Sequence, residues 1–127
     1  MRSASSIDDG AGIVRLTSET WVSALVRRIH GEGGFAAVLR RGNDQAGAVF
    51  ITVRERDGSV RLLVPAPQSL MDSTDRSFVE RNVADEDEIG RILAGEQRFD
   101  SDLWVVEIEG LAGPLADYLN VVPEDRI

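Results

Sequence analysis

The fold is decided by residues 48–64, which read AVFITVRERDGSVRLLV. Within residues 48–56 every second residue from Val49 to Val53 is aliphatic, as expected of a β-strand with one buried face. The dipeptide Asp57-Gly58 is a strong signal for a tight hairpin turn, because such turns need residues that tolerate positive φ. A second apolar run over residues 59–64 supplies the return strand. This stretch therefore predicts an antiparallel β-hairpin.

A two-residue turn at Asp57-Gly58 would fix the pairing of the two strands. Arg54 then lies opposite Arg61, and Val53 lies opposite Leu62. One face of the hairpin is aliphatic and packs on the core, whereas the other face carries all three of its arginines, Arg54, Arg56 and Arg61. Like charges directly opposite each other are destabilising, so the pair of Arg54 and Arg61 needs solvent or carboxylate partners.

A helix and a strand precede the hairpin. Thr17 is a suitable N-cap, and apolar side chains recur behind it at the helical spacing i, i+3, i+4, i+7. Gly31 stands where a C-cap belongs, so we expect a helix over residues 18–30. Residues 35–40 then form a short strand, and residues 42–47 form a loop.

Further elements follow the hairpin. Residues 78–83 suit a short strand, and Asp85 and Glu88 have the spacing of a capping box that starts a second helix. Residues 102–109 form a strand with consecutive apolar side chains at its centre, so we expect it inside the sheet rather than at an edge. Pro114 suits the first position of a short helix.

This order of elements predicts an α+β domain, with an antiparallel or mixed sheet of four or five strands and two main helices packed on one face. Helices do not alternate with strands, so the chain is not a doubly wound α/β fold. We expect residues 1–12 to form a mobile N-terminal arm, residues 13–110 a single domain, and residues 111–127 a C-terminal extension with a short helix.

The composition excludes many kinds of chemistry. All 14 basic residues of the 127-residue chain are arginine; lysine and cysteine are absent, and there is one histidine. The sequence therefore excludes disulfides, thiolate metal sites, lysine Schiff bases and multi-histidine metal sites. No serine or carboxylate lies in a recognisable nucleophile motif, and no cofactor motif is present. The sequence favours a protein without catalytic activity over an enzyme, and it predicts no cofactor.

The charge of the chain is unevenly distributed. Residues 1–71 carry nine arginines and seven acidic residues (net +2), whereas residues 72–127 carry five arginines and 15 acidic residues (net −10). The total of −8 disfavours nucleic acid as a partner. The first residues lack the apolar core of a signal peptide, and no apolar run is long enough to cross a membrane. We expect a cytoplasmic protein without membrane contact.

Four arginines are candidates for a small-anion site. Arg40 and Arg41 end the first strand, and Arg54 and Arg61 lie in the hairpin. The planar guanidinium group suits carboxylate and phosphate ligands. The alternative is internal pairing, since 22 acidic residues are enough to neutralise every arginine.

Four carboxylates are candidates for a Mg²⁺ site. Asp100 lies just before the strand predicted over residues 102–109 and Asp102 begins it, and Glu107 and Glu109 share one face of it. Such a site would support a Mg²⁺-dependent hydrolase. The favoured alternative pairs Glu107 and Glu109 with the hairpin arginines across the sheet.

His30 and the following Gly31-Glu32-Gly33-Gly34 segment each allow two interpretations. A lone histidine can be a general base, but a helix C-terminus favours a histidine through the helix dipole alone. The glycines lead from a helix into a strand, which is the reverse of a phosphate-binding loop. We favour structural roles for both.

Three segments together carry a family resemblance: residues 15–28, RLTSETWVSALVRR; residues 34–42, GFAAVLRRG, with Ala46-Gly47-Ala48; and residues 98–109, RFDSDLWVVEIE. In this order they resemble a bacterial family of small proteins known only as a domain of unknown function, over about residues 13–110. The resemblance implies a bacterial, cytoplasmic, single-domain protein. It implies no activity, cofactor or catalytic residue.

Three hypotheses for the function follow. The leading one is a non-catalytic interaction module that binds a protein partner or self-associates through an exposed strand edge as a homodimer. The second is a small-anion-binding or regulatory domain that uses Arg40, Arg41, Arg54 and Arg61. The third is the Mg²⁺-dependent hydrolase with Asp100, Asp102, Glu107 and Glu109.

Overall fold

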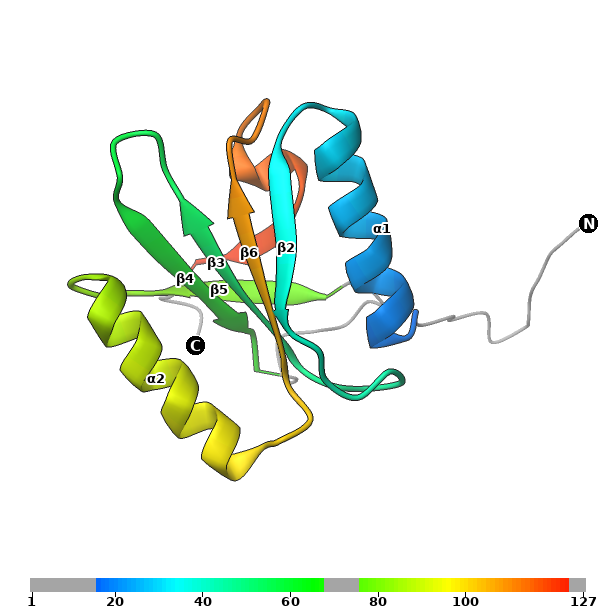
Figure 1. The fold of residues 1–127 in the computed structure, drawn as a ribbon, viewed down its shortest axis with the longest axis vertical. Helices are drawn as coiled ribbons and strands as arrows, with labels where there is room; N and C mark the ends of the chain where they lie inside the picture. The colour runs from blue at the N-terminus through cyan, green and yellow to red at the C-terminus, as the bar shows by residue number, and fades with distance from the viewer. Residues whose placement is uncertain (1–15, 68–75, 124–127) are drawn as a thin grey trace, which may run out of the picture.

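A computed structural model of the chain describes residues 16–67 and 76–123, so the predicted N-terminal arm lies outside the described residues. The described part contains two α-helices, one mixed β-sheet and a short 3-10 helix (Figure 1). The helices are α1 (Ser18–Gly31), α2 (Glu86–Phe99) and the 3-10 helix η2 (Leu115–Asp117). The strands are β2 (Phe35–Arg40), β3 (Val49–Arg54), β4 (Val60–Pro65), β5 (Ser77–Arg81), β6 (Trp104–Glu109) and β7 (Asn120–Val122).

The sheet has the strand order β2-β6-β3-β4-β5-β7. Antiparallel pairs join β2 to β6, β3 to β4 and β4 to β5, whereas β6 runs parallel to β3 and β7 parallel to β5. The predicted α+β class with a mixed sheet is confirmed. The sheet has one strand more than the four or five expected, because residues 120–122 of the predicted extension pair with β5.

Both predicted helices are confirmed, and so are their N-caps. The expected C-cap at Gly31 is wrong, because α1 includes Gly31 and its C-cap is Glu32. Thr17 Oγ1 accepts a hydrogen bond of 3.2 Å from Thr20 N at the start of α1. At the start of α2, the Asp85 side chain accepts one of 2.9 Å from Glu88 N. These bonds satisfy N–H groups that lack a partner within the helix.

The hairpin register differs from the predicted one by one residue. Glu55 N donates to Ser59 O at 2.8 Å, so the loop contains three residues and ends at Gly58, whose φ is +91°. Asp57 Oδ1 accepts from Ser59 N at 2.9 Å and holds this longer loop. Arg61 therefore lies opposite Val53 and not opposite Arg54.

This shift changes the side-chain pattern of the hairpin. A slip of one residue moves side chains to the other face of a sheet. Val53 and Arg61 share one face, whereas Arg54 and Val60 share the other. The predicted repulsion between Arg54 and Arg61 is wrong, because the two guanidinium groups leave the sheet on opposite sides.

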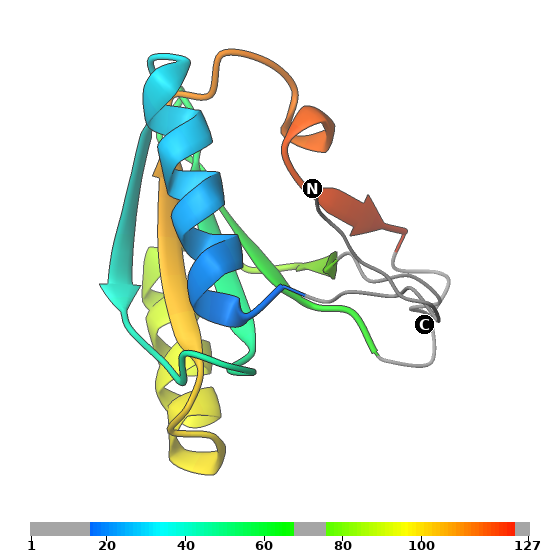
Figure 2. The same cartoon turned by 90° about the vertical axis from the view of Figure 1, so that its right-hand side faces the viewer.

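The sheet is covered on both faces, and the expectation that both helices pack on one face is wrong. The α1 side chains Val22, Leu25 and Ile29 pack on one face, and Leu93 of α2 packs beside Phe50 on the other. Figure 2 shows α1 in front of the sheet and α2 behind it. The physical reason is that β3 and β6 carry apolar side chains on the second face as well, where Phe50 and Val105 form a small buried cluster that needs its own cover.

β6 lies between β2 and β3, which confirms the expectation that this strand is inside the sheet. Because β6 is inserted there, β2 does not pair with β3, the next strand in the sequence, and it forms one edge of the sheet. The other edge is β7, which has only three residues. β2 is thus the longer of the two edge strands.

Candidate functional site

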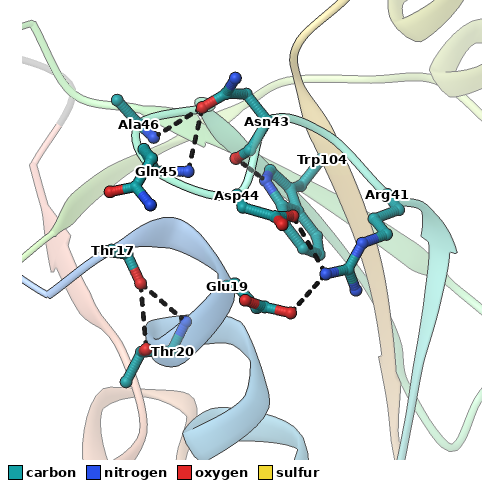
Figure 3. Close-up of polar contacts among 9 residues, drawn as sticks. All are labelled: Thr17, Glu19, Thr20, Arg41, Asn43, Asp44, Gln45, Ala46 and Trp104. Carbon is teal, nitrogen blue, oxygen red and sulfur yellow. Dashed lines mark hydrogen bonds and ion pairs between the residues drawn. The ribbon is translucent and has the colours of Figure 1, made fainter.

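Arg41 is held at the start of α1 by two carboxylates. It pairs with Glu19 and, at 3.0 Å, with Asp44 (Figure 3). Its guanidinium carbon lies 5.1 Å from the centre of the Trp104 ring. The hydrogen bond to Glu19 raises the pKa of Arg41 above its ordinary value. Arg41 therefore connects the first strand to α1.

The loop of residues 42–47 beside Arg41 is bound tightly to β6. Asn43 N donates to Asp102 O, and Trp104 Nε1 donates to Asn43 O, both at 2.8 Å. The Asn43 side chain accepts from the backbone of Gln45 and Ala46, as Figure 3 shows. This loop serves the fold, because its polar groups are used to hold α1 and β6 in place.

Arg54 and Arg61 are paired with carboxylates on opposite faces of the sheet. Arg54 Nη2 lies 2.5 Å from Glu86 and its Nε lies 3.8 Å from Glu107. Glu86 is the main reason that the pKa of Arg54 is raised. Arg61 forms ion pairs with Glu80 and Glu55, at 2.7 and 3.1 Å, and Glu80 is the main cause of its raised pKa.

Arg40 is bound differently from the other three. Its Nη2 donates to the carbonyl of Ser101 at 2.8 Å, and its buried Nε has no hydrogen-bond partner among the described residues. A small-anion site over all four arginines would need them to converge on one surface. The structure instead places Arg54 and Arg61 on opposite faces and Arg41 at the start of α1.

The four candidate metal ligands are also separated by their contacts. The Asp100 side chain accepts a hydrogen bond of 2.9 Å from Asp102 N in the turn before β6. Glu107 forms the ion pair with Arg54 that the sequence favoured, and Glu109 is the register partner of Arg54 across the parallel pair. Over residues 16–67 and 76–123, no group of three or more metal-ligating side chains comes together.

The edge strand β2 carries an unusual number of exposed apolar side chains. Three of the five large apolar residues that are exposed in the described chain belong to it: Phe35 (51% exposed), Val38 (42%) and Leu39 (59%). The register with β6 shifts between Val38 and Arg40, which makes Leu39 the extra residue of a β-bulge. Edge strands of folded proteins usually carry charges that discourage pairing, and residues 35–39 carry none.

A hollow between α2 and the sheet adjoins this surface at Leu39, and Arg54 with its partners Glu86 and Glu107 forms part of its lining. It has a volume of about 200 Å³ and includes Leu39, Ile89, Gly90 and Leu93 in its lining. Of the α2 side chains, only Ile89 is fully buried, so this helix covers its face of the sheet loosely. Apolar surface is therefore accessible on the α2 side of β2.

His30 lies against the outer side of β2. Its Nε2 is 2.9 Å from Ala36 O and 3.2 Å from Ala36 N. The ring also lies beside Phe35, with 6.2 Å between the ring centres. The favoured structural interpretation of His30 agrees with these contacts, although the sequence did not reveal that the contacts are with a strand edge.

The C-terminal segment is attached to α1 by a second polar cluster. The Tyr118 hydroxyl donates to Glu32 at 2.5 Å, and Arg28 pairs with Glu32 at 3.3 Å. The guanidinium carbon of Arg28 lies 4.4 Å from the centre of the Tyr118 ring. Through its bond to Glu32, Tyr118 has a raised pKa, and the same bond lowers the pKa of Glu32.

Tyr118 is the only tyrosine of the chain, so its titration can be followed directly by the ultraviolet absorbance of tyrosinate. We expect a midpoint above the ordinary value of about 10. A pKa raised by folding means that the contact stabilises the fold below about pH 10 and is lost as the pH rises through the folded pKa. Glu32→Gln should move the midpoint back down, and an equal midpoint in both proteins would contradict this assignment.

Comparisons with known proteins agree with this fold. The family described as "Protein of unknown function (DUF1491)" matches residues 16–114. This chain belongs to that family. The resemblance expected over about residues 13–110 is thereby confirmed. No curated protein matches the chain at a significant level.

Solved structures of similar proteins give the same result. The solution structure of protein Atu0922 from A. tumefaciens is 45% identical, covers 87% of this chain and 98% of its own, and has a TM-score of 0.74. A crystal structure of a DUF1491 family protein from Caulobacter crescentus is 33% identical, covers 86% of this chain and 99% of its own, and has a TM-score of 0.69.

Within residues 16–67 and 76–123, no helix is long and apolar enough to cross a bilayer.

Sequence reasoning missed Phe35, Val38 and Leu39 as candidate functional residues. A signal for them was present, because residues 35–39 read FAAVL and contain no charge. A strand buried on both sides would read in the same way. Only the insertion of β6 between β2 and β3 distinguishes the two cases, and local sequence patterns do not encode that order.

Proposed function

We propose that this domain is a non-catalytic interaction module that forms a homodimer by pairing β2 with β2 of a second copy. The observation that carries the proposal is the concentration of exposed apolar side chains on one edge strand. Exposed strand edges present unpaired N–H and C=O groups that another strand can bind. Three of the four candidate anion-binding arginines, Arg41, Arg54 and Arg61, support the proposal indirectly, because they are held in internal ion pairs.

The hydrogen-bonding pattern of β2 supports an antiparallel pairing centred on this part of the strand. Ala36 N and O both contact His30 rather than β6, so these groups point outward, and by alternation those of Val38 do too. In an antiparallel dimer, Ala36 would exchange hydrogen bonds with Val38 of the second copy, and Val38 with its Ala36. The twofold axis then passes beside Ala37.

The side chains of β2 favour a second copy as the occupant. In this register Phe35 faces Leu39 of the other copy, and this apolar pair occurs twice because the interface is symmetric. Residues 35–39 offer no charge that would select an acidic or a basic partner. The surface is thus complementary to itself.

Light scattering over a range of concentrations tests the proposal. The chain has a mass of 13.9 kDa, and we expect the weight-average mass to rise toward twice that value with increasing concentration. The interface is small, so we expect a dissociation constant on the order of 100 μM. A mass that stays at that of the monomer at about 1 mM chain would overturn the proposal.

A further inference from the structure

We infer that His30 is a built-in competitor for the β2 edge, which occupies the hydrogen-bonding groups of Ala36 until a second strand displaces it. The inference rests on the proposed function, because it describes how access to that same edge is controlled. For His30 the sequence allowed a general base and favoured a structural role at the helix C-terminus.

The C-terminal end of α1 covers the first half of the outer edge of β2. Gly34 N donates to Ile29 O at 2.9 Å, and the His30 ring lies against both Ala36 N and Ala36 O. Val38 has the next outward-facing backbone groups, and within residues 16–67 and 76–123 no hydrogen bond from outside the sheet reaches them. The backbone groups of Ala36 are therefore occupied by His30, whereas those of Val38 are available to a second strand.

The contact between His30 and Ala36 is an incomplete substitute for a strand. A single ring nitrogen either accepts from Ala36 N or donates to Ala36 O, depending on the tautomer, and it cannot do both at once. A paired strand would satisfy both groups at the same time. A second copy thus gains a hydrogen bond at Ala36 when it replaces the histidine.

Displacement of the ring leaves the core unchanged. His30 is exposed, whereas its neighbour Ile29, which anchors this turn of α1, is 1% exposed. The ring can therefore rotate into solvent while α1 remains packed. The cost of this step lowers the apparent affinity of the edge, because only the fraction of molecules with the ring displaced can pair fully.

The test compares dimerisation of the full chain with His30→Ala and His30→Gln by analytical ultracentrifugation. His30→Ala frees Ala36 without adding a competitor, so dimerisation no longer has to break the hydrogen bond between His30 and Ala36 in each copy. We expect the dissociation constant to fall about tenfold, which corresponds to one or two net hydrogen bonds. His30→Gln is the matched control, because its amide reaches a similar position to Nε2 and can compete for the same groups. We expect its dissociation constant to stay near that of the wild type.

Hydrogen exchange at the Ala36 amide gives a second readout. In dilute His30→Ala the amide should exchange faster than in the wild type, and it should regain protection as the concentration rises. A dimer whose dissociation constant is unchanged or raised in His30→Ala overturns this inference and leaves the proposed function intact. If both proteins remain monomers at about 1 mM, the proposed function fails, and the inference fails with it.

Discussion

Replacing Gly47 by alanine is expected to lower the free energy of unfolding by about 3 kcal/mol, a large part of the stability of a domain of this size. An added Cβ would lie 2.3 Å from the backbone oxygen of Asp102 and 2.9 Å from the Trp104 ring. Neither neighbour can move easily, because Trp104 is 1% exposed and its indole nitrogen is bonded to Asn43. Gly42→Ala should have a similar effect, since its Cβ would lie 2.1 Å from the same oxygen.

Gly90→Ala is the matched control for this prediction. Gly90 lies inside α2, and an added Cβ there meets nothing within 4 Å. Alanine should therefore raise the free energy of unfolding by about 0.5 to 1 kcal/mol through helix propensity alone. Urea unfolding followed by circular dichroism measures both changes. A loss of less than about 1 kcal/mol for Gly47→Ala would contradict the close contact between the loop of residues 42–47 and β6.

Val38→Glu is expected to weaken dimerisation by about a hundredfold. Each dimer would contain two added carboxylates at the centre of the paired edge, and burying each one without a partner costs about 1.4 kcal/mol or more. In the monomer the same side chain is 42% exposed, so the carboxylate remains hydrated and the fold should be retained. Sedimentation velocity at several concentrations would measure the loss.

Phe99→Glu provides the control for the Val38 variant. Phe99 is 94% exposed at the end of α2, so the substitution makes the same change from apolar to acidic on another element. We expect dimerisation to be unchanged within about twofold. If Phe99→Glu abolished the dimer and Val38→Glu did not, the interface would lie on α2 and not on β2.

Much of the fold follows from local signals in the sequence. The caps Thr17 and Asp85 and the apolar periodicity behind them are sufficient to predict both helices, because each signal lies within a few residues of the structure it determines. The hairpin was predicted for the same reason. Its register was not, because the Asp57 side chain bonds to Ser59 and stabilises a three-residue loop in place of the shorter one.

The arrangement of the candidate site depends on contacts that are distant in sequence. Arg54 meets Glu86 and Glu107, and Arg61 meets Glu80, only after the strands have been ordered in the sheet. The sequence established that enough carboxylates exist, but it did not establish which ones would be adjacent. The edge position of β2 depends on the same step, because β6 pairs with it from the far end of the chain.

An isotope-filtered nuclear Overhauser measurement on a mixture of labelled and unlabelled chain tests the pairing of β2 most directly. A twofold axis beside Ala37 places the α-protons of the two Ala37 residues close together, as in any antiparallel pair without mutual hydrogen bonds. We therefore predict a strong intermolecular signal between the two Ala37 α-protons, together with signals between Phe35 and Leu39. Intermolecular signals that arise only from α2 or from other strands would contradict the proposed function.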